Sequence, residues 1–348
     1  MGVAAQPTER FQRRAAVVLR VAVLIIAGLV LRHQLAGLHR AQLTAAFRRY
    51  DASQIALALL YTVASFATLG LIELLALRYA ERGAADTIPR RAALATAFVA
   101  HAFSQSIGFG LLTGGAARLR AYARYDVNAA TVARASVFVS ATTLLGLCSL
   151  GSIALLTTPG FSSLGWTRTG ATWLGAAMAA LVIAYFSWCA LGRRAPITVS
   201  RWHITPPSAT IAALQMLLAT ADWLVAGMVL FSLLPHGTST PFTVFLGAYL
   251  VAHAAGIASH VPAGAGVFEV AFLGLLAPGA ANPEHAGLIA SLLAYRVLYY
   301  LLPLCAAAAL ATMSELGRGH GVLSSSHSAS TFSADTSQPD RTSQPRRQ

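Results

Sequence analysis

The sequence is divided into long apolar stretches separated by short polar connectors. A membrane-spanning helix needs roughly 17–25 consecutive, mostly apolar residues to cross the hydrocarbon core of a bilayer. Stretches of this kind lie at residues 15–31, 52–77, 128–157, 170–191, 208–233 and 286–311. Two further stretches, 92–124 and 242–277, are as long but are interrupted by glycine or proline. The pattern predicts an all-α integral membrane protein, a polytopic helical bundle that contains two broken helical hairpins.

The composition is that of a membrane protein. Of the 348 residues, 56% are hydrophobic and only 11% are charged, and the mean hydropathy is +0.62. Soluble domains carry about 25% charged residues. The net charge of +13 comes from arginine, because the chain contains no lysine. Since the arginines lie at the ends of apolar stretches, we expect them to face the cytoplasm and its anionic leaflet, and we expect no nucleic acid partner.

The chain is predicted to form one membrane domain between two cytoplasmic ends. Residues 1–14 form the N-terminus, 15–315 the polytopic transmembrane domain, and 316–348 a disordered tail rich in serine, proline and charge. A cleaved signal peptide would also begin with arginines, but the first apolar run is long enough to span. Arginines in the first outer loop oppose this orientation unless residues 39–50 form an amphipathic interfacial helix. We expect a bacterial inner membrane protein with both termini in the cytoplasm.

The second broken stretch carries ionisable groups beside its break. The ionisable residues are His253, His260 and Glu269, and the break contains Pro262, Gly264 and Gly266. In lipid, irregular backbone is tolerated only inside protein or beside a water-filled cavity, and such breaks mark transporter binding sites. At about 1.5 Å per residue, Gly264–Ala277 would reach roughly 21 Å, short of the ~30 Å hydrocarbon core. A re-entrant hairpin is therefore predicted, and eight uninterrupted spans are the alternative.

The first broken stretch combines a polar helical face with a basic end. The polar side chains at i, i+3 and i+4 are His101, Ser104 and Gln105, and after a glycine-rich segment that includes Gly114 come Arg118 and Arg120. The planar guanidinium group suits a lipid phosphate, because it donates two hydrogen bonds at once. We predict that the two arginines line the mouth of a translocation path. The alternative is that they are ordinary cytoplasmic anchors.

The two broken stretches share a short sequence. Val99–Ala102 and Val251–Ala254 have the same four letters, and a glycine follows each histidine at the same spacing, Gly114 and Gly266. Because inverted repeats meeting at the membrane midplane are a recurring transporter design, the match predicts an internal inverted repeat. A chance match in an alanine-rich chain is the alternative.

Charged residues also occur near the middle of uninterrupted stretches. Asp222 and Arg296 are at such positions, where an unpaired charge costs several kcal/mol. Arg296 is predicted to pair with Asp222 or with Glu269, or else to contact a lipid phosphate. Glu73 is expected to have a structural role and to pair with Arg78 on its own helix.

Signatures of catalysis are missing from the sequence. There is no HExxH motif, no G-x-S-x-G motif and no phosphate-binding loop with its lysine. His253, His260 and Glu269 could ligate zinc but lack a recognisable metal spacing. We therefore predict no enzymatic activity, no metal and no cofactor, with a membrane-embedded enzyme as a remote alternative.

Three segments resemble the transmembrane region of the lysylphosphatidylglycerol synthase/flippase family, which includes the multiple peptide resistance factors and their stand-alone relatives. They are HAFSQSIGFGLLTGGAARLRAY (His101–Tyr122), HVPAGAGVFEVAFLGLL (His260–Leu276) and YRVLYYLLP (Tyr295–Pro303). The resemblance covers most of residues 15–315. It implies an inner-membrane domain that translocates aminoacylated or other phospholipids, and it implicates Gly114–Arg118, Pro262–Glu269 and Tyr295–Arg296. Full-length members add an aminoacyl-transferase domain where this chain has its tail, so aminoacyl transfer is not expected.

These observations predict a lipid translocase for an anionic or aminoacylated phospholipid or a related lipid-linked substrate. We expect Arg118, Arg120 and Arg296 to hold an anionic head group, Glu269 and Asp222 to balance a cationic group or carry a proton, and His101 and His260 to line the path. The alternative is a non-transporting membrane subunit that scaffolds a separate lipid-modifying enzyme. A homo-oligomer is also left open.

Overall fold

A computed structural model describes most of the predicted membrane domain. The described residues are 50–81, 87–107, 110–157, 168–191, 197–199, 202–235, 240–277 and 285–313, and those up to residue 307 belong to one compact unit. The predicted first span at 15–31, the interfacial helix at 39–50 and both cytoplasmic ends lie outside the described residues.

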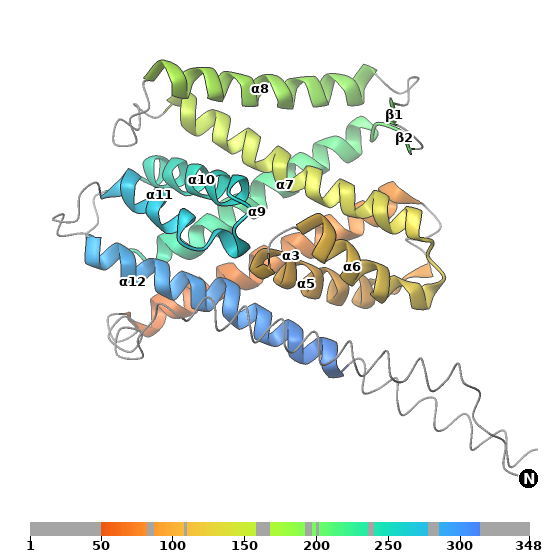
Figure 1. Cartoon of the computed structure of the whole chain (residues 1–348), viewed down its shortest axis with the longest axis horizontal. Coiled ribbons are helices and arrows are strands. Elements are labelled where there is room, and N and C mark those ends of the chain that lie inside the picture. The colour runs from red at the N-terminus through yellow and green to blue at the C-terminus, as the bar shows by residue number, and fades with distance from the viewer. Residues whose placement is uncertain are drawn as a thin grey trace, which may run out of the picture. The chain divides into compact units, whose positions relative to one another are not determined.

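Long apolar helices form the body of this unit (Figure 1). They are α3 (Ala52–Ala80), α7 (Ala129–Thr157), α8 (Arg168–Leu191) and α9 (Ala209–Ser232), together with a last span from Ala286 to Met313. The last span begins as α12 (His285–Tyr295) and continues through a π-helical turn, η5 (Arg296–Leu301). The shortest of the five has 24 residues, about 36 Å at 1.5 Å per residue, which is enough to cross the core. The all-α membrane fold is confirmed, with ends within a few residues of the predicted ones.

Two helical hairpins occupy the broken stretches. The first consists of α5 (Arg90–Ile107) and α6 (Gly110–Tyr122), which η1 (Ala123–Tyr125) follows. The second consists of α10 (Phe242–Ala258), the turn η4 (Pro262–Gly264) and α11 (Val267–Leu276). In each hairpin the two arms pack against each other. With 13 and 10 residues, α6 and α11 reach only about 20 Å and 15 Å, so both breaks are confirmed.

A small β-hairpin departs from the all-helical prediction. β1 (Ile197–Val199) pairs antiparallel with β2 (Trp202–Ile204), with Thr198 opposite His203. It lies in the polar connector that precedes α9, so it leaves the membrane helices unchanged.

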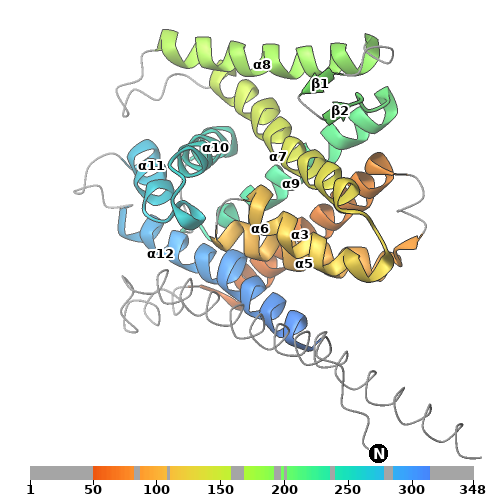
Figure 2. The same cartoon turned by 45° about the vertical axis from the view of Figure 1, so that its right-hand side comes forward.

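The long helices support both hairpins. α3 contacts α5, α7, α9 and η5, while α7 contacts α6, α8, α9 and α10 (Figure 2). At the crossing of α7 and α9, a Cβ on Gly146 would lie 2.6 Å from Trp223 Cδ1 and 2.8 Å from the Ala219 carbonyl oxygen. Small residues of this kind let membrane helices approach closely.

Large apolar side chains face outward from the unit. Examples are Val63 on α3, Ile183 on α8 and Leu217 on α9, which are 67%, 65% and 64% exposed. Such residues suit contact with lipid tails rather than water. The four-residue match places Val99–Ala102 and Val251–Ala254 in the first arms of the two hairpins, α5 and α10. Their inverted relation in a membrane stays a prediction.

Candidate functional site: a cavity between the two broken hairpins

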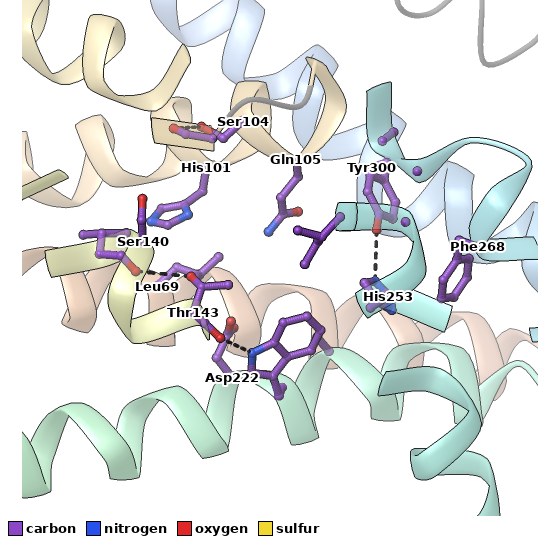
Figure 3. Close-up of a pocket in the computed structure, with 18 of the residues that line it drawn as sticks. Leu69, His101, Ser104, Gln105, Ser140, Thr143, Asp222, His253, Phe268 and Tyr300 are labelled. Carbon is purple, nitrogen blue, oxygen red and sulfur yellow. Dashed lines mark hydrogen bonds between the residues drawn. The ribbon is translucent and has the colours of Figure 1, made fainter. Parts of the chain in front are cut away.

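A cavity of about 530 Å³ lies between the first hairpin, the second hairpin and the long helices. Figure 3 shows His101, Gln105, Asp222 and His253 around it. The lining residues predicted from the sequence are His101, Ser104, Gln105, Arg118, Asp222, His253, His260 and Gly264. The others, Gly114, Arg120, Pro262, Gly266, Glu269, Tyr295 and Arg296, are not part of its lining. Both breaks therefore border a hollow space that contains polar groups.

The first hairpin contributes the polar face that the sequence predicted. His101, Ser104 and Gln105 all line the cavity from α5. The Ser104 hydroxyl donates to the Gly110 carbonyl at 3.3 Å and lies 3.4 Å from the Thr113 hydroxyl, which holds the two arms together. The Gln105 Oε1 atom is buried and has no hydrogen-bond partner among the described residues.

Arg118 is held in a buried ion pair with α3. Its Nε donates to both Glu73 carboxylate oxygens at 2.9 and 2.8 Å, and Tyr122 donates to Glu73 at 2.8 Å. The side chains of Arg118 and Glu73 are only 3% and 0% exposed. The predicted pairing of Glu73 with Arg78 is therefore wrong, because the partner comes from another helix.

His101 completes this cluster. Its Nε2 lies 3.3 Å from Arg118 Nη2, and because arginine only donates, the histidine nitrogen accepts. A Cβ on Gly114 would lie 2.6 Å from Ser104 Oγ and 2.9 Å from Arg118 Nη1, so glycine leaves room for both side chains. Arg120 is exposed and does not line the cavity, so of the predicted pair only Arg118 does.

A second ion pair joins the second hairpin to the last span. Arg296 Nε donates to Glu269 Oε1, and Glu269 Oε2 accepts from the Gly266 amide at 2.7 Å. Glu269 therefore caps α11 and compensates its N-terminal dipole. Of the pairings left open from the sequence, Arg296 with Glu269 is the one formed. The Arg296 Nη1 atom is buried and has no hydrogen-bond partner among the described residues.

An aromatic cluster surrounds His253. Its ring centroid lies 4.3 Å from that of Tyr249, 4.4 Å from that of Phe268 and 5.3 Å from that of Trp223. Nδ1 donates to the Tyr249 carbonyl at 3.1 Å, so Nε2 of the neutral ring accepts from the Tyr300 hydroxyl at 3.4 Å (Figure 3). These contacts fix the ring and its tautomer at the cavity wall.

Asp222 has no charged partner in the described part of the chain. It lines the cavity from α9 and accepts a hydrogen bond from Ser65 at 2.7 Å. The Ser65 hydroxyl also lies 2.9 Å from the Tyr299 hydroxyl. The predicted pairing of Asp222 with Arg296 is not formed, because Arg296 binds Glu269.

The connector of the second hairpin has an unusual backbone. His260 and Ala263 have positive φ of 55°, and Gly264 and Gly266 have φ of 59° and 84°. Non-glycine residues rarely adopt this left-handed conformation, and it concentrates at functional sites. A Cβ on Gly264 would lie 3.0 Å from Gly256 Cα, so the connector packs tightly on α10.

Among the described residues, no three His, Cys, Asp or Glu side chains lie close enough together to hold a metal ion. In particular, Glu269 is engaged with Arg296 and the α11 N-terminus rather than with the two histidines.

Comparison with known proteins gives the family. The model of the lysylphosphatidylglycerol synthase TM region matches residues 17–307. The chain belongs to this family. The match confirms the resemblance carried by the three sequence segments, all of which lie within the matched residues.

Curated relatives differ in how much of their length the chain covers. An uncharacterized protein of Synechocystis sp. is 34% identical over 214 residues, 60% of this chain and 64% of that protein. The inner membrane protein YbhN of Escherichia coli is 31% identical over 266 residues, 74% of this chain and 79% of YbhN. The phosphatidylglycerol lysyltransferase of Staphylococcus haemolyticus is 26% identical over 318 residues, 88% of this chain but 35% of that protein. The chain thus spans just under two thirds of the first relative and about a third of the lysyltransferase.

Three residues of the site were not predicted from the sequence of this member of the lysylphosphatidylglycerol synthase TM region family. Asp222 accepts a hydrogen bond from Ser65, and His253 packs against the rings of Trp223 and Tyr249. Ser65 is one hydroxyl among several in an apolar helix, and aromatic residues are common in membrane helices. Only their three-dimensional neighbours distinguish them.

Proposed function

We propose that the protein moves a phospholipid or a related lipid between the leaflets of a bacterial inner membrane. The observation that carries the proposal is the cavity of about 530 Å³ between two broken hairpins. Ligand sites of roughly 300–1,000 Å³ are large enough for small molecules, so a lipid head group fits this volume. Irregular backbone beside a polar cavity is also the usual form of a transporter site.

The cavity combines polar and apolar lining, as an amphipathic substrate requires. Asp222, Gln105 and three histidines, His101, His253 and His260, supply polar groups. Leu112 on α6 and Ile257 on α10 also line it and are 70% and 57% exposed. The head group would occupy the polar part while the acyl chains pass the apolar rim.

The charged residues at the cavity determine which lipid head groups it can bind. Arg118 and Arg296 are each paired with a carboxylate, so binding an anion by either requires its ion pair to open. Asp222 has no such partner among the described residues and favours a positive group or a proton. Phosphatidylglycerol and its aminoacylated derivatives are the first candidates, because a relative is a phosphatidylglycerol lysyltransferase. The cytoplasmic location of both termini belongs to this proposal.

The test is lipid movement by the purified full chain in liposomes. Fluorescent phosphatidylglycerol, aminoacylated phosphatidylglycerol and phosphatidylethanolamine are placed in both leaflets, and outer-leaflet label is bleached with dithionite. The proposal predicts that the inner-leaflet label of at least one lipid becomes accessible faster than in protein-free liposomes. Equal rates for every lipid would reject it. Capture of a lipid-modifying enzyme together with absent lipid movement would favour the scaffold alternative.

A further inference from the structure

Asp222 differs from Glu73 on α3 and Glu269 on α11 in having no arginine partner among the described residues. Glu73 and Glu269 are each bound to an arginine. Asp222 lines the cavity near the middle of α9, and no cationic side chain of the described residues lies within ion-pair distance of it. A carboxylate in a membrane protein is costly without a compensating positive charge and marks a functional site by default. Because Asp222 lines the cavity, a compensating cation or proton can reach it from there.

A directed chain of hydroxyl groups ends at this carboxylate. Ser65 donates to Asp222 Oδ1 at 2.7 Å, and Ser65 Oγ lies 2.9 Å from Tyr299 OH. Serine has one hydroxyl hydrogen, so when it donates to Asp222, Tyr299 must donate to serine. If Asp222 gains a proton on Oδ1, it becomes the donor, and the direction of both hydrogen bonds can reverse. The chain thus has two arrangements that differ by one proton.

The Ser65 and Tyr299 hydroxyl groups also connect the helices that support the two hairpins. Ser65 lies two helical turns before Glu73 on α3, and Glu73 anchors the first hairpin through Arg118. Tyr299 lies one turn after Arg296 in η5, and Arg296 anchors the second hairpin through Glu269. A change of charge at Asp222 is therefore placed to act on both anchors.

We propose that Asp222 is the proton-binding site that couples lipid movement to a transmembrane proton gradient. This inference rests on the proposed translocase function and adds its energy source. A proton from cavity water adds to the carboxylate to give a neutral carboxylic acid, and its release to water on the other side restores the carboxylate. No other bond forms or breaks.

The other ionisable groups around the cavity fit this assignment. The first hairpin contributes His101 from α5 and Arg118 from α6, and Glu73 already compensates the charge of Arg118. The remaining ionisable groups are Tyr249 and His253 on α10, Tyr299 and Tyr300 in η5, and His260 in the connector of the second hairpin. α7 contributes the hydroxyls of Ser140 and Thr143. Among the described residues that line the cavity, Asp222 is the only acidic side chain, which is why the proton is assigned to it.

The experiment measures the steady-state leaflet ratio of a transported fluorescent lipid in liposomes with an imposed pH difference. Valinomycin with equal potassium on both sides holds the membrane potential at zero. For one proton per neutral lipid, one pH unit supports a ratio of at most about tenfold. The wild-type chain should build such an imbalance, and reversing the pH difference should reverse it. Asp222→Asn should lose the imbalance, whereas the matched control Asp51→Asn, at the exposed N-cap of α3, should retain it.

Ser65→Ala supplies a second readout, because it keeps the carboxylate and removes its donor. Loss of a hydrogen bond to the ionised form favours protonation, so the pH of half-maximal rate should rise. If wild-type lipid movement does not depend on the pH difference, the proton coupling is wrong but the translocase function remains. An unchanged pH profile in Ser65→Ala would have the same consequence. If Asp222→Asn slows the movement of amine-bearing lipids only, and does so at every pH difference, Asp222 contacts the lipid head group instead of carrying a proton. No lipid movement by the wild type would reject both proposals.

Discussion

The ion pairs of Arg118 and Arg296 are predicted to differ in their contribution to stability. Arg118→Ala leaves Glu73 buried and unpaired, which should cost about 3–5 kcal/mol of folding free energy. Arg296→Ala should cost less, because Glu269 is 22% exposed and still accepts from the Gly266 amide. Thermal unfolding of each variant in detergent, monitored by size-exclusion chromatography, measures the loss of stability relative to the wild type.

The matched control is Arg124→Ala. This arginine lies over the ring of Tyr125 in η1 and is exposed, so its loss should change the unfolding temperature little. An Arg118→Ala protein as stable as the Arg124→Ala protein would contradict the structural role of the Arg118–Glu73 pair.

Residue identities predicted some of these contacts and not others. The pairing of Arg296 with Glu269 was one of the alternatives predicted from the sequence. The hydrogen bond from the Gly266 amide to Glu269 was not predicted, although it joins residues only three positions apart. The partner of Glu73 lies 45 positions away, and the nearby Arg78 was the wrong choice. Asp222 was recognisable as unusual from its apolar surroundings, but its bond to Ser65 joins residues 157 positions apart. Sequence spacing reports neighbours on one helix and says little about neighbours on different helices.

At the scale of elements, the connector of the second hairpin is predicted to depend on two glycines in different ways. A Cβ on Gly266 would meet nothing within 4 Å, so the cost of Gly266→Ala is backbone strain alone, about 1–3 kcal/mol at its φ of 84° and ψ of −45°. Gly264→Ala carries the same kind of strain and also brings a Cβ to 3.0 Å from Gly256 Cα. Gly264→Ala should therefore unfold at a lower temperature than Gly266→Ala in the same detergent. The reverse order would contradict the described packing of the connector on α10.

The elements themselves were largely predictable. Of the six uninterrupted spans predicted from apolar length, five lie in the described residues and are confirmed, and the glycine and proline positions predicted both breaks. A bilayer imposes length and backbone satisfaction on any helix, which is why these features are visible in the sequence. The π-helical turn at Arg296–Leu301 was not predicted, since nothing in its sequence breaks the helix. The β-hairpin at 197–204 was also missed, because a polar connector carries no strong strand pattern.

At the scale of the whole molecule, the central claim is that the cavity between the hairpins is the path of the lipid. Ser140 lines this cavity from α7, so Ser140→Trp should fill part of it. Val63 on α3 is 67% exposed and does not line the cavity, so Val63→Trp should only enlarge the lipid-facing surface.

The most direct measurement is the rate of lipid movement in liposomes for wild type, Ser140→Trp and Val63→Trp, each reconstituted at equal density. Ser140→Trp should slow the movement by on the order of tenfold, equivalent to about 1.4 kcal/mol of added barrier, while Val63→Trp should keep the wild-type rate. Equal rates for the two variants, with both proteins folded, would contradict the central claim.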